Sequence, residues 1–410
     1  MKILHICYSD LEGGAARAAY RLHQAQRKQG LDSQMLVINK CSDDPKVHAV
    51  SGFRRIRTQL ASLFSRNILR LQQNPNPVLH SLNLFPSGLL HDIEKLAPDI
   101  INLHWLGGEM LSIGEIGRIQ QPVVWTLHDM WAFSGAEHYD DDKPSERYRV
   151  SYSKGSRHPS HQGIDLDRWI FQRKQKLWQG KSFHIVTPSH WMADCVRQSD
   201  LFSKMPTRVI SNCIDHLLYR PLSRELAREA LKFPIDKQLI LFGAMSSTSD
   251  PRKGYHLLIP ALQQLTAEGK TENVELVIFG ASNGDAESLT GIQARYMGTM
   301  HDDISLILLY NAADIFIAPS LQDNLPNTLV ESLACGTPCV TFNTGGMLDL
   351  IHDPCMGEVS KEITHEALSE AISIALTKEY DRESIAIKSA KSRDETNIVK
   401  KYNELYQSIK

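Results

Sequence analysis

The chain has 410 residues, of which 42% are hydrophobic and 22% charged, and its formal net charge is −2. This length is too great for one compact core, so we expect two domains. The nearly balanced charge excludes a general attraction to nucleic acid, and any basic site must be local. The seven cysteines are scattered without a C-x-x-C pair, which indicates reduced cytoplasmic thiols rather than a disulfide framework.

The first residues, Lys2 to Tyr8, form a strand-like run without the apolar core of a signal peptide. No apolar run in the sequence approaches transmembrane length. We therefore expect a cytoplasmic protein, which could still contact the inner face of the cytoplasmic membrane.

Short β-rich runs alternate with longer helical stretches from one end of the chain to the other. This alternation predicts an α/β protein with parallel sheets and crossover helices. The strand signal stops near Asp215, so we predict two Rossmann-like domains, residues 1–215 and 216–394, with a helix at about 395–410 that could pack back on the first. The predicted strands cover residues 2–8, 34–39, 99–104, 122–127, 183–188, 207–211, 238–243, 274–279, 314–318 and 338–342.

The first predicted strand leads into Gly13 and Gly14, and small residues with Arg17 then open a helix. Glycines let a ligand approach the backbone, and an arginine offers positive charge to an anion. A tight strand-to-helix turn that packs closely explains the same residues. Both interpretations stay open at this point.

A basic amphipathic helix is predicted between Arg54 and Arg70, and the chain has no acidic residue between Asp44 and Asp92. Such a helix can bind anionic lipid or an anionic acceptor. An ordinary helix that packs its apolar face on its own domain is the interpretation that the sequence favours. The apolar residues at helical spacing are Ile56, Leu60, Leu63, Phe64, Ile68 and Leu71.

Two successive predicted strands end in a histidine, His104 with Trp105 after it, and His128. An imidazole at the carboxyl end of a buried strand can hydrogen-bond a sugar hydroxyl or move a proton. A lone histidine there is more often a structural residue, and Trp125 and Trp131 could pack on a sugar face or belong to the core. We interpret His128 as functional and assign Arg17, His104 and Trp105 to the acceptor side of the site.

The segment 140–165 is polar and lacks periodicity, which predicts a long loop that could act as a lid or bind the acceptor. Its Asp140-Asp141-Asp142 run resembles a metal-binding motif only superficially, and we interpret it as solvated. Histidines and cysteines do not cluster at the spacing of zinc ligands, and no G-x-S-x-G motif occurs. We therefore predict no metal site and no nucleophilic catalysis.

In the second half, the strand at 238–243 and a loop of small residues lead into Arg252, Lys253 and Gly254 before a helix. Two cations there would bind a diphosphate, the arginine through its bidentate fork and the lysine as a point charge. A solvated basic turn is the alternative. The position after the first strand of the domain favours the binding role.

Two carboxylates, Asp323 and Glu331, lie around the start of a helix that follows the strand 314–318. Ligands of open parallel sheets bind outside the carboxyl ends of the strands, where helix N-termini also point. Backbone N–H groups could bind a diphosphate there, and the carboxylates could accept hydrogen bonds from sugar or ribose hydroxyls.

With these motifs, nearly the whole chain resembles bacterial GT-B glycosyltransferases of family 4, the retaining type that builds O-antigen, colanic acid and other surface polysaccharides. The most specific part is the pair of acidic residues with seven residues between them, kept here as Asp323 and Glu331 and followed by Ala334-Cys335-Gly336-Thr337-Pro338. The resemblance implies two Rossmann-like domains whose parallel sheets face across a cleft, with the acceptor bound by the N-terminal domain and the nucleotide sugar by the C-terminal one.

The resemblance also implies a role for each candidate residue. His128, Asp323 and Lys253 would be catalytic, with His128 and Asp323 at the donor sugar and Lys253 at the diphosphate. Glu331 would hold the ribose hydroxyls. Further donor contacts would come from the phosphate-binding Gly13, Gly14 and Arg252, the nucleobase-binding Tyr296 and Met297, and the backbone of Asn324 and Leu325.

Two departures from the family pattern bear on donor identity. The first carboxylate is the aspartate Asp323, one methylene shorter than the glutamate of the family. Ala244-Met245-Ser246 stands where the family has an arginine, and Arg252 could substitute for it.

The implied function is transfer of a hexose-type sugar from a UDP- or GDP-linked donor to a hydroxyl of a lipid-linked oligosaccharide. The anomeric configuration would be retained, and no metal or other cofactor would be required. A nucleotide-sugar epimerase or hydrolase on the same fold is one alternative. A non-catalytic sugar-nucleotide-binding subunit is another, although a pure binder would not need His128 in addition to the carboxylate pair.

Overall fold

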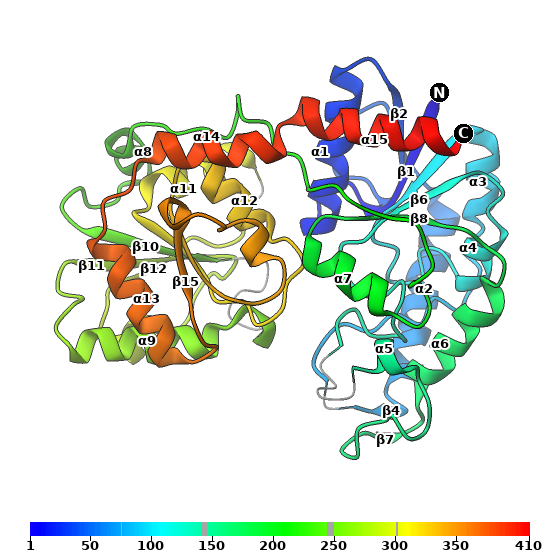
Figure 1. Cartoon of the computed structure of the whole chain (residues 1–410), viewed down its shortest axis with the longest axis horizontal. Helices are drawn as coiled ribbons and strands as arrows, with labels where there is room; N and C mark the ends of the chain where they lie inside the picture. The colour runs from blue at the N-terminus through cyan, green and yellow to red at the C-terminus, as the bar shows by residue number, and fades with distance from the viewer. Residues whose placement is uncertain (75, 141–145, 244–249, 301) are drawn as a thin grey trace. The chain divides into compact units, whose positions relative to one another are not determined.

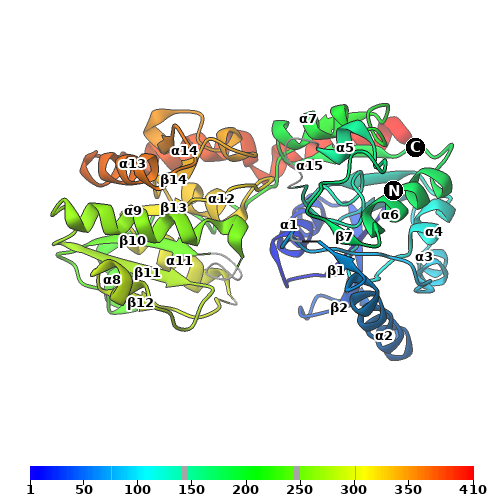
Figure 2. The same cartoon turned by 90° about the horizontal axis from the view of Figure 1, so that it is seen from below.

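The computed structural model describes all residues of the chain except 75, 141–145, 244–249 and 301 (Figure 1). It forms two compact units, each with one parallel sheet covered by helices (Figures 1 and 2). Unit 1 consists of Met1–Cys213 and Glu395–Lys410, and unit 2 of Ile214–Asp394. Within the described residues, no helix combines the length and the apolar character that crossing a bilayer requires.

The sheet of unit 1 has seven parallel strands in the order β3-β2-β1-β5-β6-β8-β9. The chain moves from β1 outward to β2 and β3 and then returns to β5 on the other side, so the carboxyl ends of β1 and β5 form a topological switch point. The strands are β1 (Lys2–Ser9), β2 (Asp32–Asn39), β3 (Val47–Ala49), β5 (Ile100–Leu103), β6 (Val123–Thr126), β8 (His184–Thr187) and β9 (Thr207–Val209).

The connections of unit 1 are mainly helical. The helices are α1 (Gly14–Lys28), α2 (Gly52–Leu69), α3 (Leu89–Leu96), α4 (Ile113–Arg118), α5 (Arg147–Val150), α6 (Leu166–Leu177) and α7 (His190–Gln198). A small antiparallel sheet pairs β4 (Gln72–Gln73) with β7 (Gln162–Gly163).

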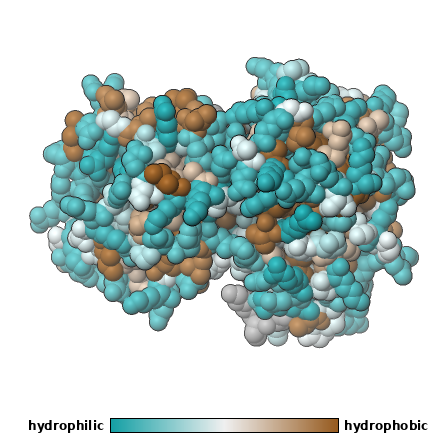
Figure 3. All heavy atoms as spheres, turned by 45° about the horizontal axis from the view of Figure 1, so that its top comes forward, coloured by the Kyte–Doolittle hydropathy of each residue, from teal (hydrophilic) through white to brown (hydrophobic). Residues whose placement is uncertain are grey.

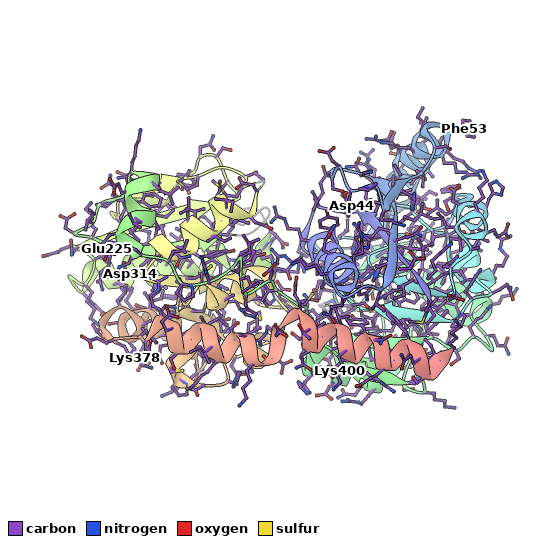
Figure 4. All side chains as sticks on the ribbon, turned by 90° about the horizontal axis from the view of Figure 1, so that it is seen from above. Asp44, Phe53, Glu225, Asp314, Lys378 and Lys400 are labelled. Carbon is purple, nitrogen blue, oxygen red and sulfur yellow. The ribbon has the colours of Figure 1, made fainter. Side chains whose placement is uncertain are left out.

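The last helix of the chain, α15 (Glu395–Ile409), is part of unit 1 (Figure 4, where Lys400 lies on it). Its buried side chains Ile398, Tyr402 and Tyr406 pack in one cluster with Ile3 and Val124 of the sheet. Burial of several large side chains on both partners ties the two ends of the chain into one core.

The sheet of unit 2 has six parallel strands in the order β12-β11-β10-β13-β14-β15, with the switch point between β10 and β13. The strands are β10 (Gln238–Gly243), β11 (Val274–Phe279), β12 (Ala294–Tyr296), β13 (Ile315–Ala318), β14 (Cys339–Phe342) and β15 (Gly357–Ser360). The helices are α8 (Arg224–Leu231), η1 (Pro251–Lys253), α9 (Tyr255–Ala267), α10 (Ala286–Thr290), α11 (Asp303–Ala312), α12 (Asn327–Ala334), η2 (Met347–Asp349), η3 (Pro354–Met356), α13 (His365–Thr377) and α14 (Arg382–Arg393).

All ten predicted strands are present, with ends shifted by two residues at most. The edge strands β3, β12 and β15 are missing from the prediction because each has only three or four residues, with polar ones among them. They pair on one side only, so they need no continuous apolar run.

The segment 140–165 differs from its prediction. It contains α5 and β7, and it buries the side chains of Arg147, Tyr148 and Tyr152, so it is anchored in unit 1 rather than a free loop. Asp140 is buried, which makes its solvated interpretation wrong, whereas Asp141 and Asp142 lie outside the described residues.

Two apolar features also differ from their predictions. Trp125 and Trp131 are both buried in the main core of unit 1, so neither offers a face to a sugar. On α2, the apolar side chains from Phe53 to Phe64 are exposed, so the predicted packing on unit 1 is wrong for most of this face, although Ile68 of the predicted set packs against the main core. Elsewhere the surface is mainly hydrophilic with separate apolar patches in the view of Figure 3.

Candidate functional site

Three histidines from three neighbouring strands form a hydrogen-bonded chain in unit 1. His128 follows β6, His104 follows β5, and His5 lies inside β1. His128 Nε2 lies 3.0 Å from His104 Nδ1, and His104 Nε2 lies 2.9 Å from His5 Nδ1. The chain ends at Gln26 of α1, whose Oε1 is 2.8 Å from His5 Nε2. At the switch point of the sheet, these four polar side chains are therefore hydrogen-bonded in series inside the apolar core of unit 1.

The hydrogen bonds of Gln26 give this chain a direction. The Gln26 amide nitrogen faces the Tyr406 hydroxyl at 3.3 Å, so the amide oxygen faces His5 and accepts a hydrogen bond from the His5 Nε2–H. His5 Nδ1 then accepts from His104, and His104 Nδ1 accepts from His128 Nε2. A neutral His128 consequently keeps its lone pair on Nδ1, the nitrogen outside the chain.

Burial keeps all three histidines neutral near pH 7. Burial, helped by the neighbouring His23, lowers the pKa of His5 to about 3. Burial and the adjacent imidazoles lower the pKa of His104 well below 6.5. The pKa of His128 falls to about 4 through burial, although Asp129 opposes the change. A neutral imidazole can accept a hydrogen bond from a hydroxyl or donate one.

A second polar group adjoins the end of this chain. His138 Nδ1 lies 2.6 Å from an Asp129 carboxylate oxygen, and its Nε2 lies 2.8 Å from the Ser81 hydroxyl. The Trp105 indole nitrogen is 3.3 Å from the same imidazole. A small hollow of unit 1 is lined by side chains of both groups, among them His104, Trp105, His128, Asp129 and His138.

The predicted glycine turn lies at the N-terminus of α1, after the carboxyl end of β1. Gly13 caps the helix with a φ of 97°, a value that favours glycine. Gly14 is exposed, Arg17 is half-buried, and the first turn of α1 has no acidic residue. The positive end of this helix is therefore open to an anion.

In unit 2, the structure brings the predicted cation and carboxylate together. Lys253 Nζ lies 2.6 Å from an Asp323 carboxylate oxygen, although the two residues are 70 positions apart. Lys253 ends η1 after β10, and Asp323 follows β13, the neighbouring strand. Both side chains are partly exposed. The pair therefore lies at the carboxyl edge of the sheet, where ligands of such folds bind.

Close backbone packing holds this pair in place. Gly254, at a φ of +72°, lies so near Pro319 that a Cβ atom there would be 1.8 Å from the Pro319 carbonyl oxygen. A Cβ at Gly345 would be 2.2 Å from the Asp323 carbonyl oxygen, which accepts a hydrogen bond from the Gly346 N–H at 3.0 Å. Only glycine permits these approaches, so the loops after β10, β13 and β14 are fixed against one another.

Glu331 lies in α12 and is only 2% exposed. One of its carboxylate oxygens accepts a hydrogen bond from the buried Tyr310 hydroxyl at 2.8 Å. Burial, together with the Glu331 charge, raises the pKa of Tyr310 well above 10, so the phenol keeps its proton. Tyr310 thus orients the carboxylate.

The remaining candidates of unit 2 lie around this pair. Arg252 forms an ion pair with Asp250 at 2.7 Å, and its carbonyl accepts from the Leu321 N–H. Asn324 and Leu325 are buried. Tyr296 ends β12, two strands away from β10, and Met297 follows it; the Tyr296 hydroxyl accepts from the Ala286 N–H. Ala244-Met245-Ser246, which stand where the family has an arginine, lie outside the described residues.

Sequence reasoning missed His5, Gln26, His138 and Tyr310. His5 carried a readable signal, because a polar residue inside a buried strand needs a partner. Tyr310 and Gln26 lie on helices that give no such signal.

Comparisons with known proteins agree with this architecture. A family model described as Glycosyltransferase Family 4 matches residues 12–216, and one described as Glycosyl transferases group 1 matches residues 223–393. The D-inositol 3-phosphate glycosyltransferase of Mycobacterium tuberculosis is 26% identical over 355 residues, which are 82% of this chain and 65% of that protein.

Solved structures share the fold. Sucrose-phosphate synthase from Thermosynechococcus elongatus superposes with a TM-score of 0.67 at 15% identity, over 100% of this chain and 99% of that one. Anabaena HepE in complex with UDP-glucose has a TM-score of 0.66 at 17% identity, over the whole of both chains. The two units of this chain thus have the GT-B fold.

Proposed function

Because the chain belongs to glycosyltransferase family 4, we propose that this glycosyltransferase moves a hexose-type sugar from a UDP- or GDP-linked donor to a hydroxyl of a lipid-linked oligosaccharide, with retention of the anomeric configuration. The acceptor would belong to the synthesis of a bacterial surface polysaccharide such as O-antigen or exopolysaccharide. The observation that carries the proposal is the Lys253–Asp323 pair at the carboxyl edge of the unit 2 sheet.

The pair supports donor binding through its charges. Lys253 and Arg252 would stabilise the negative charge that develops on the leaving diphosphate, together with the N-terminus of α12. On unit 1, we propose that the backbone amides of Gly13 and Gly14 offer a phosphate contact. Asp323 holds Lys253 at 2.6 Å and would exchange this contact for a sugar hydroxyl when the phosphate binds. Glu331, oriented by Tyr310, would accept from the ribose.

On unit 1, we propose that His128 contacts the transferred sugar as a neutral imidazole. The histidine chain fixes its Nε2 as a donor to His104, so Nδ1 is the atom offered to a ligand. A charged imidazole would compete with the lysine for the phosphate, and burial prevents that charge.

The test is transfer activity and donor binding of the Lys253→Ala protein. Removal of one charge donor to the leaving group commonly lowers kcat on the order of 100- to 1,000-fold. The matched control is Lys270→Ala, a lysine of the same unit that pairs with Glu268 at the surface. Calorimetric titration with UDP and GDP identifies the base of the donor.

Full transfer activity of Lys253→Ala and Glu331→Ala on the correct donor and acceptor would refute the proposal. Donor consumption without any acceptor would instead favour a nucleotide-sugar epimerase or hydrolase. Binding of the nucleotide without any turnover would favour a non-catalytic subunit.

We also propose that α2 contacts the inner face of the cytoplasmic membrane, where a lipid-linked acceptor lies. The helix attaches to unit 1 through Ile68 and Leu69 at its end, which pack against the main core, and through two polar contacts. In these contacts the Ser65 hydroxyl donates to Glu109 at 2.6 Å and Arg54 pairs with Asp92. The apolar side chains from Phe53 to Phe64 face outward, with Phe53 78% and Phe64 62% exposed. Figure 2 shows α2 projecting from unit 1.

The charge of the helix identifies the surface that it fits. The arginines of α2 and its end, Arg55, Arg57, Arg66 and Arg70, are exposed, and no acidic residue lies between Asp44 and Asp92. An outward apolar stripe with basic flanks matches a bilayer that contains anionic lipid.

Co-sedimentation with vesicles tests this contact. The protein should bind vesicles that contain phosphatidylglycerol and bind neutral phosphatidylcholine vesicles more weakly. The double change Leu60→Ser and Phe64→Ser removes two exposed apolar side chains that would each contribute about 1.5–3 kcal/mol on burial in the bilayer, so binding should fall on the order of 100-fold or more. Leu217→Ser, which alters an exposed leucine of unit 2, is the control. Equal vesicle binding by the Leu60→Ser/Phe64→Ser protein and the Leu217→Ser protein would contradict the proposed membrane contact of α2.

A further inference from the structure

Three side chains from distant parts of unit 1 converge away from the histidine chain. They are His80, in the connection after β4, Glu137, in the connection after β6, and Asp167, in the first turn of α6. One ligand atom of each lies within 4.8 Å of the others. Glu137 and Asp167 are each 4% exposed, and the His80 side chain is 10% exposed. The cluster is therefore inside the protein, where an unbalanced charge is costly.

Each of the three side chains is anchored through one atom and leaves another atom facing the shared space. The Tyr152 hydroxyl donates to Glu137 Oε1, and the Gln72 amide donates to Asp167 Oδ2. The His80 Nδ1–H donates to the Val78 carbonyl at 2.8 Å, so Nε2 carries the lone pair. This arrangement orients all three inner atoms and is the outer-shell support that metal ligands require.

The two inner carboxylate oxygens lack the donors that buried oxygens normally have. Among the described residues, no other side chain or backbone group donates to Glu137 Oε2 or Asp167 Oδ1, the two carboxylates lie within hydrogen-bond reach of each other, and neither forms an ion pair with a lysine or arginine. His80 Nε2 lies 3.7 Å from Asp167 Oδ1. Three electron-pair donors that face one another repel unless a cation or a shared proton lies between them.

The nearest cations have other partners. Lys174 donates to the carbonyls of Trp131, Ser134 and Gly135, and Arg147 pairs with Asp165 at 2.7 Å.

We propose that His80, Glu137 and Asp167 bind one divalent transition-metal ion, with a water molecule completing the coordination. Bond lengths of about 2.0–2.2 Å to nitrogen and oxygen place ligand atoms roughly 3–4 Å apart, which small side-chain movements reach here. One imidazole and two carboxylates suit Zn²⁺ or Mn²⁺ better than the hard Mg²⁺ and Ca²⁺ or a thiol-seeking ion.

The ion would act as a structural tie beside the functional site. His80 and Glu137 face each other in an antiparallel β-bridge. Backbone hydrogen bonds from the Ser81 N–H to the Ala136 carbonyl and from the His138 N–H to the Leu79 carbonyl extend this pairing. The residues next to the two ligands, Ser81 and His138, point into the second polar group of the site. His80 and Glu137 would bind the metal on one side of these two paired segments, and Ser81 and His138 form their hydrogen bond on the opposite side. The metal would therefore keep the two segments together and so stabilise the hydrogen bond between Ser81 and His138.

Metal content and thermal unfolding of the full chain test the proposal. The purified protein should contain about one metal ion per chain by mass spectrometry. After chelation and dialysis, Zn²⁺ or Mn²⁺ at 100 times its dissociation constant should raise Tm by roughly 5–10 °C. Tryptophan fluorescence is the readout, because all six tryptophans lie in unit 1.

Glu137→Gln and Asp167→Asn should abolish the rise in Tm, since an amide is a poor metal ligand but keeps the size of the carboxylate. His365→Gln, at an exposed pair of His365 with Glu366, is the control for adventitious surface binding and should keep the full rise. If a variant does not fold, the visible absorption bands of Co²⁺ added to the wild-type protein still show whether the ion is bound by protein ligands.

Two outcomes would overturn the proposal. In the first, the wild-type protein contains no metal, no added ion raises its Tm, and added Co²⁺ keeps the spectrum of the free ion. This result would indicate that the three groups share protons instead of a metal ion. The other is an undiminished rise in Tm for Glu137→Gln.

Discussion

The buried histidine chain makes the stability of unit 1 depend on pH in a way that one substitution isolates. His5 is fully buried, and its pKa of about 3 lies far below the value of about 6.5 in an unfolded chain. As the pH falls through 6.5, only the unfolded chain takes up the proton. The free energy of unfolding therefore falls, and the contribution of the neutral His5 is fully present only above pH 6.5.

The magnitude follows from the two pKa values. Between pH 7.5 and 5.0, a histidine that stays neutral in the folded chain but titrates at about 6.5 in the unfolded one lowers the free energy of unfolding by about 2 kcal/mol. His5→Gln removes this proton uptake. The stability difference between the wild-type protein and His5→Gln should therefore shrink by about 2 kcal/mol over this range.

Urea unfolding followed by tryptophan fluorescence measures this difference in unit 1 alone. Comparison with the variant cancels the opposite trend from Glu137, whose raised pKa makes acid stabilising over the same range. His365→Gln, an exposed histidine of unit 2, should leave the pH dependence unchanged. A wild-type-to-His5→Gln difference that stays constant within about 0.5 kcal/mol from pH 7.5 to 5.0 would refute the reasoning.

Two further predictions concern unit 2. Gly254→Ala should cost about 3 kcal/mol by urea unfolding monitored with circular dichroism, because the methyl group would meet the Pro319 carbonyl in addition to the strain of positive φ. Gly269→Ala, at a similar φ of +70° but with nothing within 4 Å, should cost only about 1–2 kcal/mol, and equal costs would contradict the packing argument. Tyr310→Phe should lower stability by about 1.5–3 kcal/mol, since it leaves the buried Glu331 without its hydroxyl donor, and an unchanged urea midpoint would contradict that role.

Local signals predicted the strands and the positions of Lys253 and Asp323 after two of them. Runs such as Leu239 to Phe242 are apolar throughout, so their burial follows from composition. Lys253 and Asp323 each follow a strand, and parallel strands bring their carboxyl ends to one edge, so sequence placed both residues near that edge. Their 2.6 Å contact required knowledge that β10 and β13 are neighbours.

The rest could not be predicted because it depends on contacts between distant segments. The spacing on α2 gave an amphipathic helix, but the side that faces unit 1 is set by Glu109 and Asp92, which lie far along the chain. His80 and Asp167 are separated by 87 positions, so a search for ligands at regular spacing passes over them. The residue pattern of one segment does not indicate which distant segment it packs against.

The place of α15 in unit 1 has a consequence for the order in which the protein can fold during synthesis. Unit 2 is complete in the chain before the first residue of α15 is made. Until then, Ile3 and Val124 lack the cover that Tyr402 and Tyr406 later provide. A ribosome that has finished unit 2 thus still carries a unit 1 whose apolar surface around Ile3 and Val124 is exposed, and this surface is covered only when α15 has been made and has packed onto it.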